Sequence, residues 1–142
     1  GVIEQFRDQE LYALPPALVI MPEGARMIEH AHHEEGSLRH MVPSDFTHEE
    51  KHTLMNAARG AHRALGMEHF SRADLIVTPS FASAKGGSAS GGKASEGKPR
   101  VYLLEVNAIP GLYPGASFPP MLGSVGSSVG EFLEHAIALA RQ

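Results

Sequence analysis

The sequence predicts an α+β fold in which an antiparallel sheet is packed by two helices. Two nearly continuous apolar runs, Ala73–Thr78 and Val101–Val106, are typical of strands that are covered on both faces. Two capping boxes, each followed by apolar residues at helical spacing, indicate helices that begin after Thr47 and after Ser128. A stretch rich in glycine, serine and lysine joins the two apolar runs, so we expect a hairpin with a flexible insertion, residues 79–100, at its tip.

Composition limits the classes of function. A chain of 142 residues suffices for one domain with a hydrophobic core, and we treat residues 1–142 as a single domain or subdomain. The net charge of −4 gives no reason to expect nucleic acid as a partner, and no apolar run approaches the length of a membrane span. The absence of cysteine excludes disulfides and thiolate catalysis and fits a cytoplasmic protein. A chain that starts at Gly1 is expected to be a fragment of a longer one.

The first helix is expected from the N-cap Thr47, with Glu50 as its capping-box acid, to Leu65, followed by Gly66 at C′. Its expected buried face consists of Leu54, Met55, Ala58, Ala61, Ala64 and Leu65. The second helix begins after Ser128, and its expected buried face consists of Phe132, His135, Ala136, Leu139 and Ala140. Elsewhere we expect a strand over Ala17–Met21, a loop or weak helix over 25–45, and a long loop over 107–128.

The string His48-Glu49-Glu50-Lys51-His52 fits the zinc-peptidase pattern H-E-x-x-H. Histidines at i and i+4 lie on one face of a helix and can share a metal ion, but a catalytic zinc also needs a third ligand. Here the motif falls in the first helical turns, where Glu50 has a capping role and Glu49 suits the helix dipole. We therefore favour a polar helix N-terminus, and keep a zinc hydrolase that uses His48, Glu49 and His52 as an alternative.

A second constellation lies on the two predicted strands. Arg72 and Asp74 are two residues apart and therefore point to the same face, and so do Glu105 and Asn107. If the strands pair as a hairpin, two carboxylates and an amide oxygen meet beside an arginine, and these oxygens are ligands that suit Mg²⁺. Gly111, just after the second strand, allows the backbone N–H groups to approach a substrate oxyanion. The alternative is a pair of amphipathic edge strands with an ordinary surface ion pair.

The segments "SRADLIV", "VYLLEVNAIPGLYPGASFPPM" and "GSS" resemble the carboxyl-terminal part of D-alanine–D-alanine ligases, which belong to the ATP-grasp superfamily. The family pattern is R-x-D on one strand, E-[VIA]-N-T-x-P-G on the next, and then a serine-bearing loop. "LPPALVIMPEG" is similar to the strand that precedes the mobile loop of these ligases, so the resemblance covers most of the chain. It implies an ATP-grasp carboxyl-terminal subdomain, with an antiparallel sheet packed by helices.

The resemblance also implies residue roles. Asp74, Glu105 and Asn107 match ligands of two Mg²⁺ or Mn²⁺ ions, and Arg72 matches the arginine that stabilises the acyl phosphate. The backbone N–H of Gly111 matches the oxyanion donor, in contact with substrate. The implied reaction consumes ATP and joins two D-alanine molecules for peptidoglycan synthesis. The implied partners are ATP, D-amino-acid substrates and the missing amino-terminal and central ATP-grasp subdomains; a homodimer is left open.

The chain departs from the family pattern at several positions. The family threonine after E-x-N is Ala108, and the family serine aligns with Ala116, so Ser117 takes the substrate-binding role only if the loop shifts. The mobile-loop lysine that contacts phosphate aligns with His32, a weaker, pH-dependent cation.

The segment "VIEQFRDQE" resembles the hinge that holds adenine and ribose, which assigns nucleotide contacts to Glu4 and Glu10, although its spacing is one residue short. The departures favour a second alternative, a degenerate ATP-grasp module that binds a partner without turnover.

Overall fold

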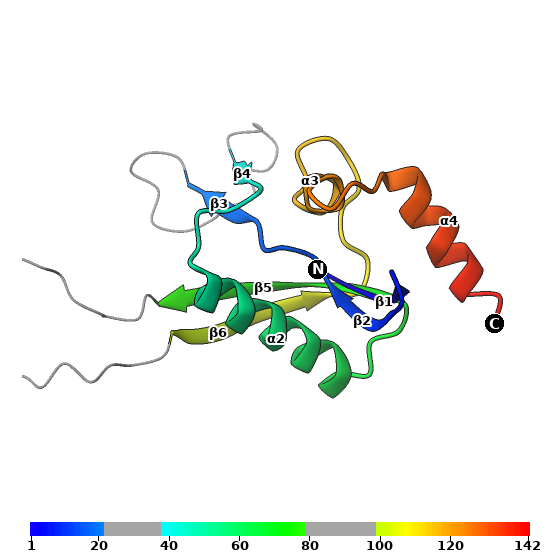
Figure 1. Cartoon of the computed structure of the whole chain (residues 1–142), viewed down its shortest axis with the longest axis horizontal. Coiled ribbons are helices and arrows are strands. Elements are labelled where there is room, and N and C mark those ends of the chain that lie inside the picture. The colour runs from blue at the N-terminus through cyan, green and yellow to red at the C-terminus, as the bar shows by residue number, and fades with distance from the viewer. Residues whose placement is uncertain (22–37, 79–98) are drawn as a thin grey trace, which may run out of the picture.

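The four-stranded sheet at the centre of the protein confirms the expected α+β class. The computed structural model describes residues 1–21, 38–78 and 99–142. The strands are β1 (Val2–Phe6), β2 (Gln9–Ala13), β3 (Leu18–Ile20), β4 (Arg39–Met41), β5 (Phe70–Thr78) and β6 (Arg100–Asn107), and the helices are α2 (His48–Ala64), α3 (Phe118–Gly123) and α4 (Val129–Leu139). The main sheet is antiparallel, in the order β2-β1-β5-β6, and β3 pairs with β4 in a separate two-stranded sheet (Figure 1).

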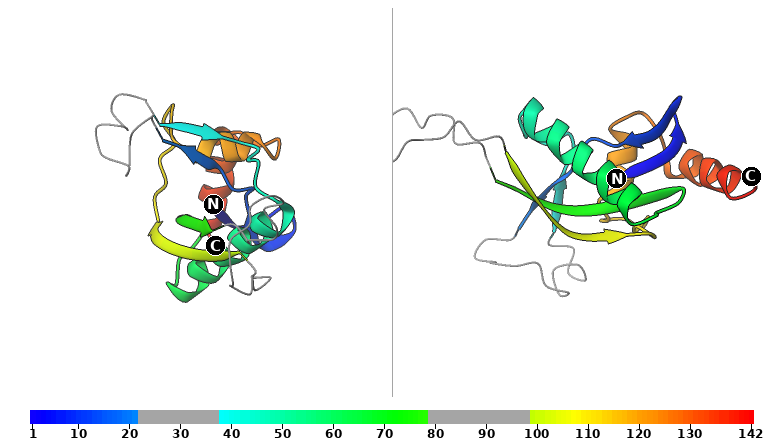
Figure 2. Two further views of the ribbon diagram at one scale, coloured as in Figure 1. Left: turned by 90° about the vertical axis from the view of Figure 1, so that its left-hand side faces the viewer. Right: turned by 90° about the horizontal axis from the view of Figure 1, so that it is seen from below.

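Two apolar cores lie on the two faces of the main sheet. The core on the α2 side contains Val2, Leu11 and Ala58. The core on the side of α3 and α4 contains Ile3, Leu14, Phe118, Met121, Leu122 and Phe132. The neighbouring residues Val2 and Ile3 enter different cores because successive strand side chains point to opposite faces. Figures 1 and 2 show α2 on one side of the sheet, and α3 with α4 on the other.

Helix α2 confirms the capping box and the boundaries predicted for it. The Oγ1 of Thr47 accepts from the backbone N–H of Glu50, and the Glu50 carboxylate accepts from the Thr47 N–H at 2.8 Å. Gly66 follows the helix with a φ of 60°, as a C′ glycine should. Leu65, expected on the buried face, is 54% exposed, because the buried stripe ends at His62. In α4, the expected burial of Phe132 and Leu139 is confirmed, and Ala140 is exposed beyond the last helical residue.

The β1–β2 hairpin was not expected from the sequence. Its two-residue loop, Arg7-Asp8, has φ values of 51° and 60°, and Phe6 pairs with Gln9 across it. Such loops usually contain Asn-Gly or Asp-Gly, so this sequence carries no turn signal. The Arg7 guanidinium lies over the rings of Phe6 and Tyr12 and donates to the backbone oxygen of Val125, contacts that hold the loop against the chain before α4.

Two expectations about irregular segments were wrong. The long loop predicted over 107–128 contains α3, whose first turn holds Pro119 and Pro120. Proline is tolerated there because the first N–H groups of a helix have no intrahelical partner. The segment predicted as a loop or weak helix contains β4, which pairs with β3. β3 confirms the predicted first strand at slightly shorter length. No helix in the described parts of the chain is long and apolar enough to cross a bilayer.

Candidate functional site

The polar residues predicted on the two long strands meet on one face of the sheet. β5 pairs with β6 so that Arg72 lies opposite Asn107 and Asp74 lies opposite Glu105. A register shift follows between Asp74 and Leu75, beyond the four polar residues. The sequence prediction that these side chains come together is therefore confirmed, and we call Arg72, Asp74, Glu105 and Asn107 the polar cluster.

Direct hydrogen bonds connect the polar cluster. The Arg72 Nε and Nη2 donate to the two carboxylate oxygens of Asp74 at 2.9 and 2.8 Å, a bidentate pair. The Asn107 Nδ2 donates to Glu105 Oε1 at 2.8 Å, and Arg72 Nη2 lies 3.7 Å from the same oxygen. The side chains are 22% exposed at Arg72, 38% at Asp74 and 61% at Glu105. The cluster thus opens to solvent on the Glu105 side.

The two carboxylates have unlike proton affinities. Burial raises the pKa of Asp74, and the adjacent Glu105 adds to this effect, while the Arg72 guanidinium opposes it. The pKa of Glu105 is lowered by the hydrogen bond from Asn107 and by a hydrogen bond with Asp74. Asp74 is therefore the carboxylate of the pair with the higher proton affinity.

The donor set of the polar cluster suits a hard divalent cation. Two facing carboxylates and one amide are oxygen ligands of the kind Mg²⁺ selects, and the exposed Glu105 leaves room for water or phosphate oxygens. A cation there would compete with Arg72 for the Asp74 carboxylate. Among residues 1–21, 38–78 and 99–142, no group of three His, Cys, Asp or Glu side chains could hold an ion. The cluster has two such carboxylates, so a cation there would need the Asn107 amide oxygen as its third protein ligand.

An apolar cleft of about 610 Å³ adjoins the polar cluster. Its floor is the edge of β5 from Arg72 to Val77, and its walls include Leu54 of α2, Leu18 of β3 and Met121 of α3. Ser117, which is 9% exposed, lines the same cleft as Arg72 and Asp74, whereas Ala116 does not. This placement supports Ser117 rather than Ala116 as the residue of that loop nearest the polar cluster.

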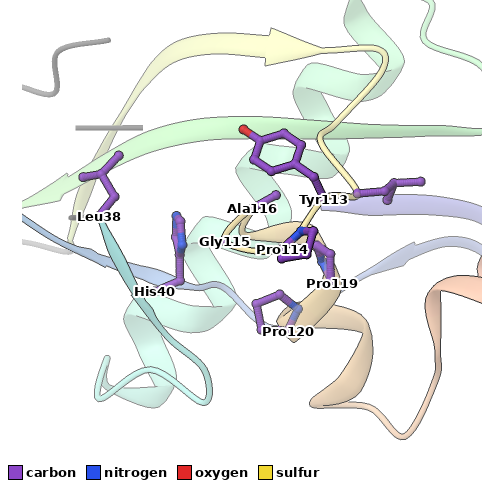
Figure 3. Close-up of a pocket in the computed structure, with 9 residues that line it drawn as sticks. Leu38, His40, Tyr113, Pro114, Gly115, Ala116, Pro119 and Pro120 are labelled. Atoms are coloured by element: carbon purple, nitrogen blue, oxygen red, sulfur yellow. The ribbon is translucent and has the colours of Figure 1, made fainter. Parts of the chain in front are cut away.

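A second pocket of about 370 Å³ is lined in part by the same loop (Figure 3). It is lined by Leu38, His40, Leu112, Tyr113, Pro114, Gly115, Ala116, Pro119 and Pro120. A side chain at Gly111 would come within 2.5 Å of the Tyr113 ring, so glycine lets that ring lie against the backbone. Sequence reasoning missed His40 and Tyr113 as pocket residues, because His40 belongs to no motif and Tyr113 has no assigned role in the segment that resembles the ligases.

The remaining predicted site residues lie apart from the polar cluster. The Glu4 carboxylate accepts from the backbone N–H of His69 at 2.8 Å and lies 3.3 Å from His62 Nε2. Glu10 is 84% exposed and 3.6 Å from Arg63. His32 and residues 79–98 of the predicted insertion lie outside the described residues. Nucleotide contacts from Glu4, Glu10 and His32 stay predictions.

The H-E-x-x-H string occupies the first turns of α2, as the polar N-terminus reading predicts. His48, Glu49 and His52 are all exposed, and the His52 Nδ1 lies 3.2 Å from the Asn56 side-chain amide nitrogen. Within the described residues, no third side chain completes a zinc site with them. The structure therefore gives the zinc-hydrolase alternative no support.

The chain is similar to curated D-alanine–D-alanine ligases. It is 31% identical over 131 residues to that of Oleidesulfovibrio alaskensis, which is 89% of this chain and 36% of the relative. It is 30% identical over 103 residues to that of Desulforudis audaxviator, which is 72% of this chain and 28% of the relative. It is 28% identical over 134 residues to that of Vibrio parahaemolyticus, which is 93% of this chain and 35% of the relative. No family model matches the chain.

The chain spans about a third of the length of the curated relatives it matches. Similarity of this extent fits a fragment of a D-alanine–D-alanine ligase. The α+β fold, with its antiparallel sheet packed against helices, is consistent with the carboxyl-terminal ATP-grasp part of such an enzyme.

Proposed function

We propose that this chain is the carboxyl-terminal ATP-grasp part of an ATP-dependent carboxylate–amine ligase, of the D-alanine–D-alanine ligase type. The observation that carries the proposal is the polar cluster: one arginine, two carboxylates and one amide on adjacent strands, with Ser117 in the adjoining cleft. The similarity to curated ligases supports the same assignment.

In the proposed reaction, ATP phosphorylates the carboxylate of one D-alanine to give an acyl phosphate and ADP. The amine of a second D-alanine then attacks the acyl carbon, the C–N bond forms, and phosphate leaves. Asp74, Glu105 and Asn107 would hold one or two Mg²⁺ ions, which neutralise the charge of the phosphates when bound. Arg72 would stabilise negative charge on the transferred group, since its guanidinium lies within 2.8 Å of Asp74 and 3.7 Å of Glu105, the carboxylates that would hold the ions.

The proposed site is half of a larger one. Ile76, Tyr102, Leu103 and Leu104, on the strands that carry the polar cluster, are between 49% and 62% exposed. Apolar exposure of this kind beside a polar cluster is typical of a surface that another part of a protein or a ligand covers. In the proposed enzyme, the remaining two thirds of the sequence would supply the second wall of the nucleotide site.

The proposal is tested in the full-length protein that contains this chain. We expect Asp74→Asn and Glu105→Gln each to lower D-alanine-dependent ADP release by at least about 10²-fold, because each removes a charge that the developing phosphoryl transfer needs. His48→Ala, in the H-E-x-x-H string, is the matched control and should leave the rate within about twofold.

The outcomes separate the candidate functions. Full activity of Glu105→Gln would contradict the ligase assignment. Retained Mg·ATP binding without ADP release, with any pair of amino acids, would indicate the degenerate binding module. Stoichiometric zinc that is lost in His52→Ala would instead support the hydrolase.

A further inference from the structure

A buried chain of hydrogen bonds joins three elements on the face of the sheet opposite Arg72. His62 of α2 and Ser71 of β5 are each 1% exposed, and the His62 Nδ1 lies 2.8 Å from the Ser71 Oγ. The His62 Nε2 lies 3.3 Å from the Glu4 Oε1 on β1. A neutral imidazole with its proton on Nε2 satisfies both contacts, since it donates to Glu4 and accepts from the Ser71 hydroxyl. We call Ser71, His62 and Glu4 the buried relay.

The buried relay has the residue types of a nucleophilic triad, but its exposure excludes that role. A nucleophilic serine must reach a substrate carbonyl, and Ser71 has almost no contact with solvent. Ser117, which lines the cleft, is a different residue on a different element. The buried relay must therefore act within the protein.

The far end of the buried relay is itself firmly held. The Glu4 backbone N–H donates to His69 O at 2.8 Å, and the Glu4 Oε2 accepts from the His69 N–H at 2.8 Å. The Nε2 of His135, on α4, donates to the Glu4 backbone oxygen at 2.7 Å. Glu4 is thus fixed to the turn before β5 and to α4, so the relay connects Ser71 to a rigid support.

The position of Ser71 in the sheet gives the buried relay its importance. β1 and β5 pair at only two positions, Val2 with Ser71 and Ile3 with Phe70. Within the described residues, Ser71 is therefore the last residue of β5 that pairs with β1, and Arg72 is the first that pairs with β6. The buried relay therefore holds β5 at the residue where its pairing changes from β1 to β6, directly before Arg72.

We propose that the buried relay positions the Arg72–Asp74 pair, with Ser71 and His62 as positioning residues that do not touch substrate. The relay fixes the distance between β5 and α2 at the residue where β5 stops pairing with β1. Only the chemical role of the Arg72–Asp74 pair rests on the proposed function; the positioning itself can be measured in this chain alone.

The primary test follows the Arg72 Nε–H by NMR, because that hydrogen donates to Asp74 at 2.9 Å. In Ser71→Ala we expect its exchange with solvent to become about two- to thirtyfold faster, the range in which networks of this kind modulate a distant group. Ser128→Ala removes the N-cap oxygen of α4 and is the control for a general loss of stability. Its Arg72 exchange should stay as in the unaltered chain.

A double variant separates positioning from simple stability. Ser71→Ala with His62→Leu removes both buried polar partners, so stability should recover relative to Ser71→Ala alone. Fast Arg72 exchange that persists in the stable double variant would support the proposal. The proposal would be overturned if the Arg72 exchange rate of the double variant returned to that of the unaltered chain as stability recovered. It would also be overturned if Ser71→Ala never changed that rate.

Binding of Mn²⁺ to the same variants links the positioning to the proposed site. We expect Ser71→Ala and the double variant to bind Mn²⁺ about two- to thirtyfold more weakly than Ser128→Ala does. If Arg72 exchange became fast while the Mn²⁺ affinity stayed unchanged, the relay would position only the Arg72–Asp74 ion pair. The claim that it also positions the metal ligands would then be wrong. If the unaltered chain bound no Mn²⁺, the proposed metal site would be wrong, while the Arg72 exchange would still decide the positioning.

Discussion

Replacing Phe132 by leucine tests how α4 is held to the sheet that carries the polar cluster. The Phe132 side chain is fully buried, and its ring lies edge to face with Phe70 at 5.0 Å and Phe118 at 5.2 Å. Leucine keeps most of the apolar burial but loses both aromatic pairs, each of which contributes about 0.5–1.5 kcal/mol. The free energy of unfolding should therefore fall by about 1–3 kcal/mol, and by about 3–5 kcal/mol in Phe132→Ala, which also leaves a cavity.

Urea denaturation followed by circular dichroism measures this change as a shift of the midpoint at an unchanged slope. Leu133→Ala is the matched control, because Leu133 is the next residue of α4 but is 43% exposed. That change should cost about 0.5 kcal/mol or less. If Phe132→Leu and Leu133→Ala lost equal stability, α4 would not be docked through Phe132 and the described core would be wrong.

Three further changes test local features. Asp8→Gly should raise the free energy of unfolding by about 0.5–1 kcal/mol, because Asp8 has a φ of 60° and this left-handed conformation costs residues other than glycine about 1–2 kcal/mol. A thermal melt with no upward shift of the midpoint would contradict the assigned turn. Thr47→Ala should lower it by about 1 kcal/mol through loss of the N-cap oxygen, with Thr53→Ala in the next turn as the comparison. Asp74→Asn tests a pH dependence. Because the pKa of Asp74 is raised on folding from its ordinary value of 3.8, its stabilising contribution is complete below that value and is lost as the pH rises through the folded pKa. The stability of Asp74→Asn relative to the unaltered chain should therefore increase as the pH rises above about 4, and a decrease in urea titrations would refute the assigned direction.

The sequence was sufficient for features that depend on local spacing. The capping boxes at Thr47 and Ser128 form as predicted, because each needs only two residues three positions apart. The polar cluster was predictable for a similar reason, since the period of two places alternate strand residues on one face. The cleft was not predictable, because it is built from β3, α2, β5 and α3, whose relative placement no local pattern encodes.

Other features were missed because their stabilising contacts are distant in sequence. The Arg7-Asp8 turn lacks the Asn-Gly or Asp-Gly pair typical of such loops, and it is held by contacts to two aromatic rings and to Val125, more than a hundred residues away. His62 was overlooked within an alanine-rich helix, since its buried position depends on Ser71 and Glu4, which belong to other elements. A lone histidine on the apolar face of a helix is the sequence signal that could have prompted the search for such partners.

The arrangement of β5 and β6 explains how the polar cluster can tolerate a long segment between its two halves. The ladder extends from Arg72 opposite Asn107 to Thr78 opposite Arg100, so the register of the cluster is fixed before the chain leaves the sheet. Loop-closure entropy rises only with the logarithm of loop length, and each doubling costs about 0.6 kcal/mol. That cost lowers the stability of the hairpin as a whole and leaves the spacing within each strand unchanged. The geometry of Arg72, Asp74, Glu105 and Asn107 therefore depends on strand pairing and on the support of β5 at Ser71, and not on the residues that connect the strands.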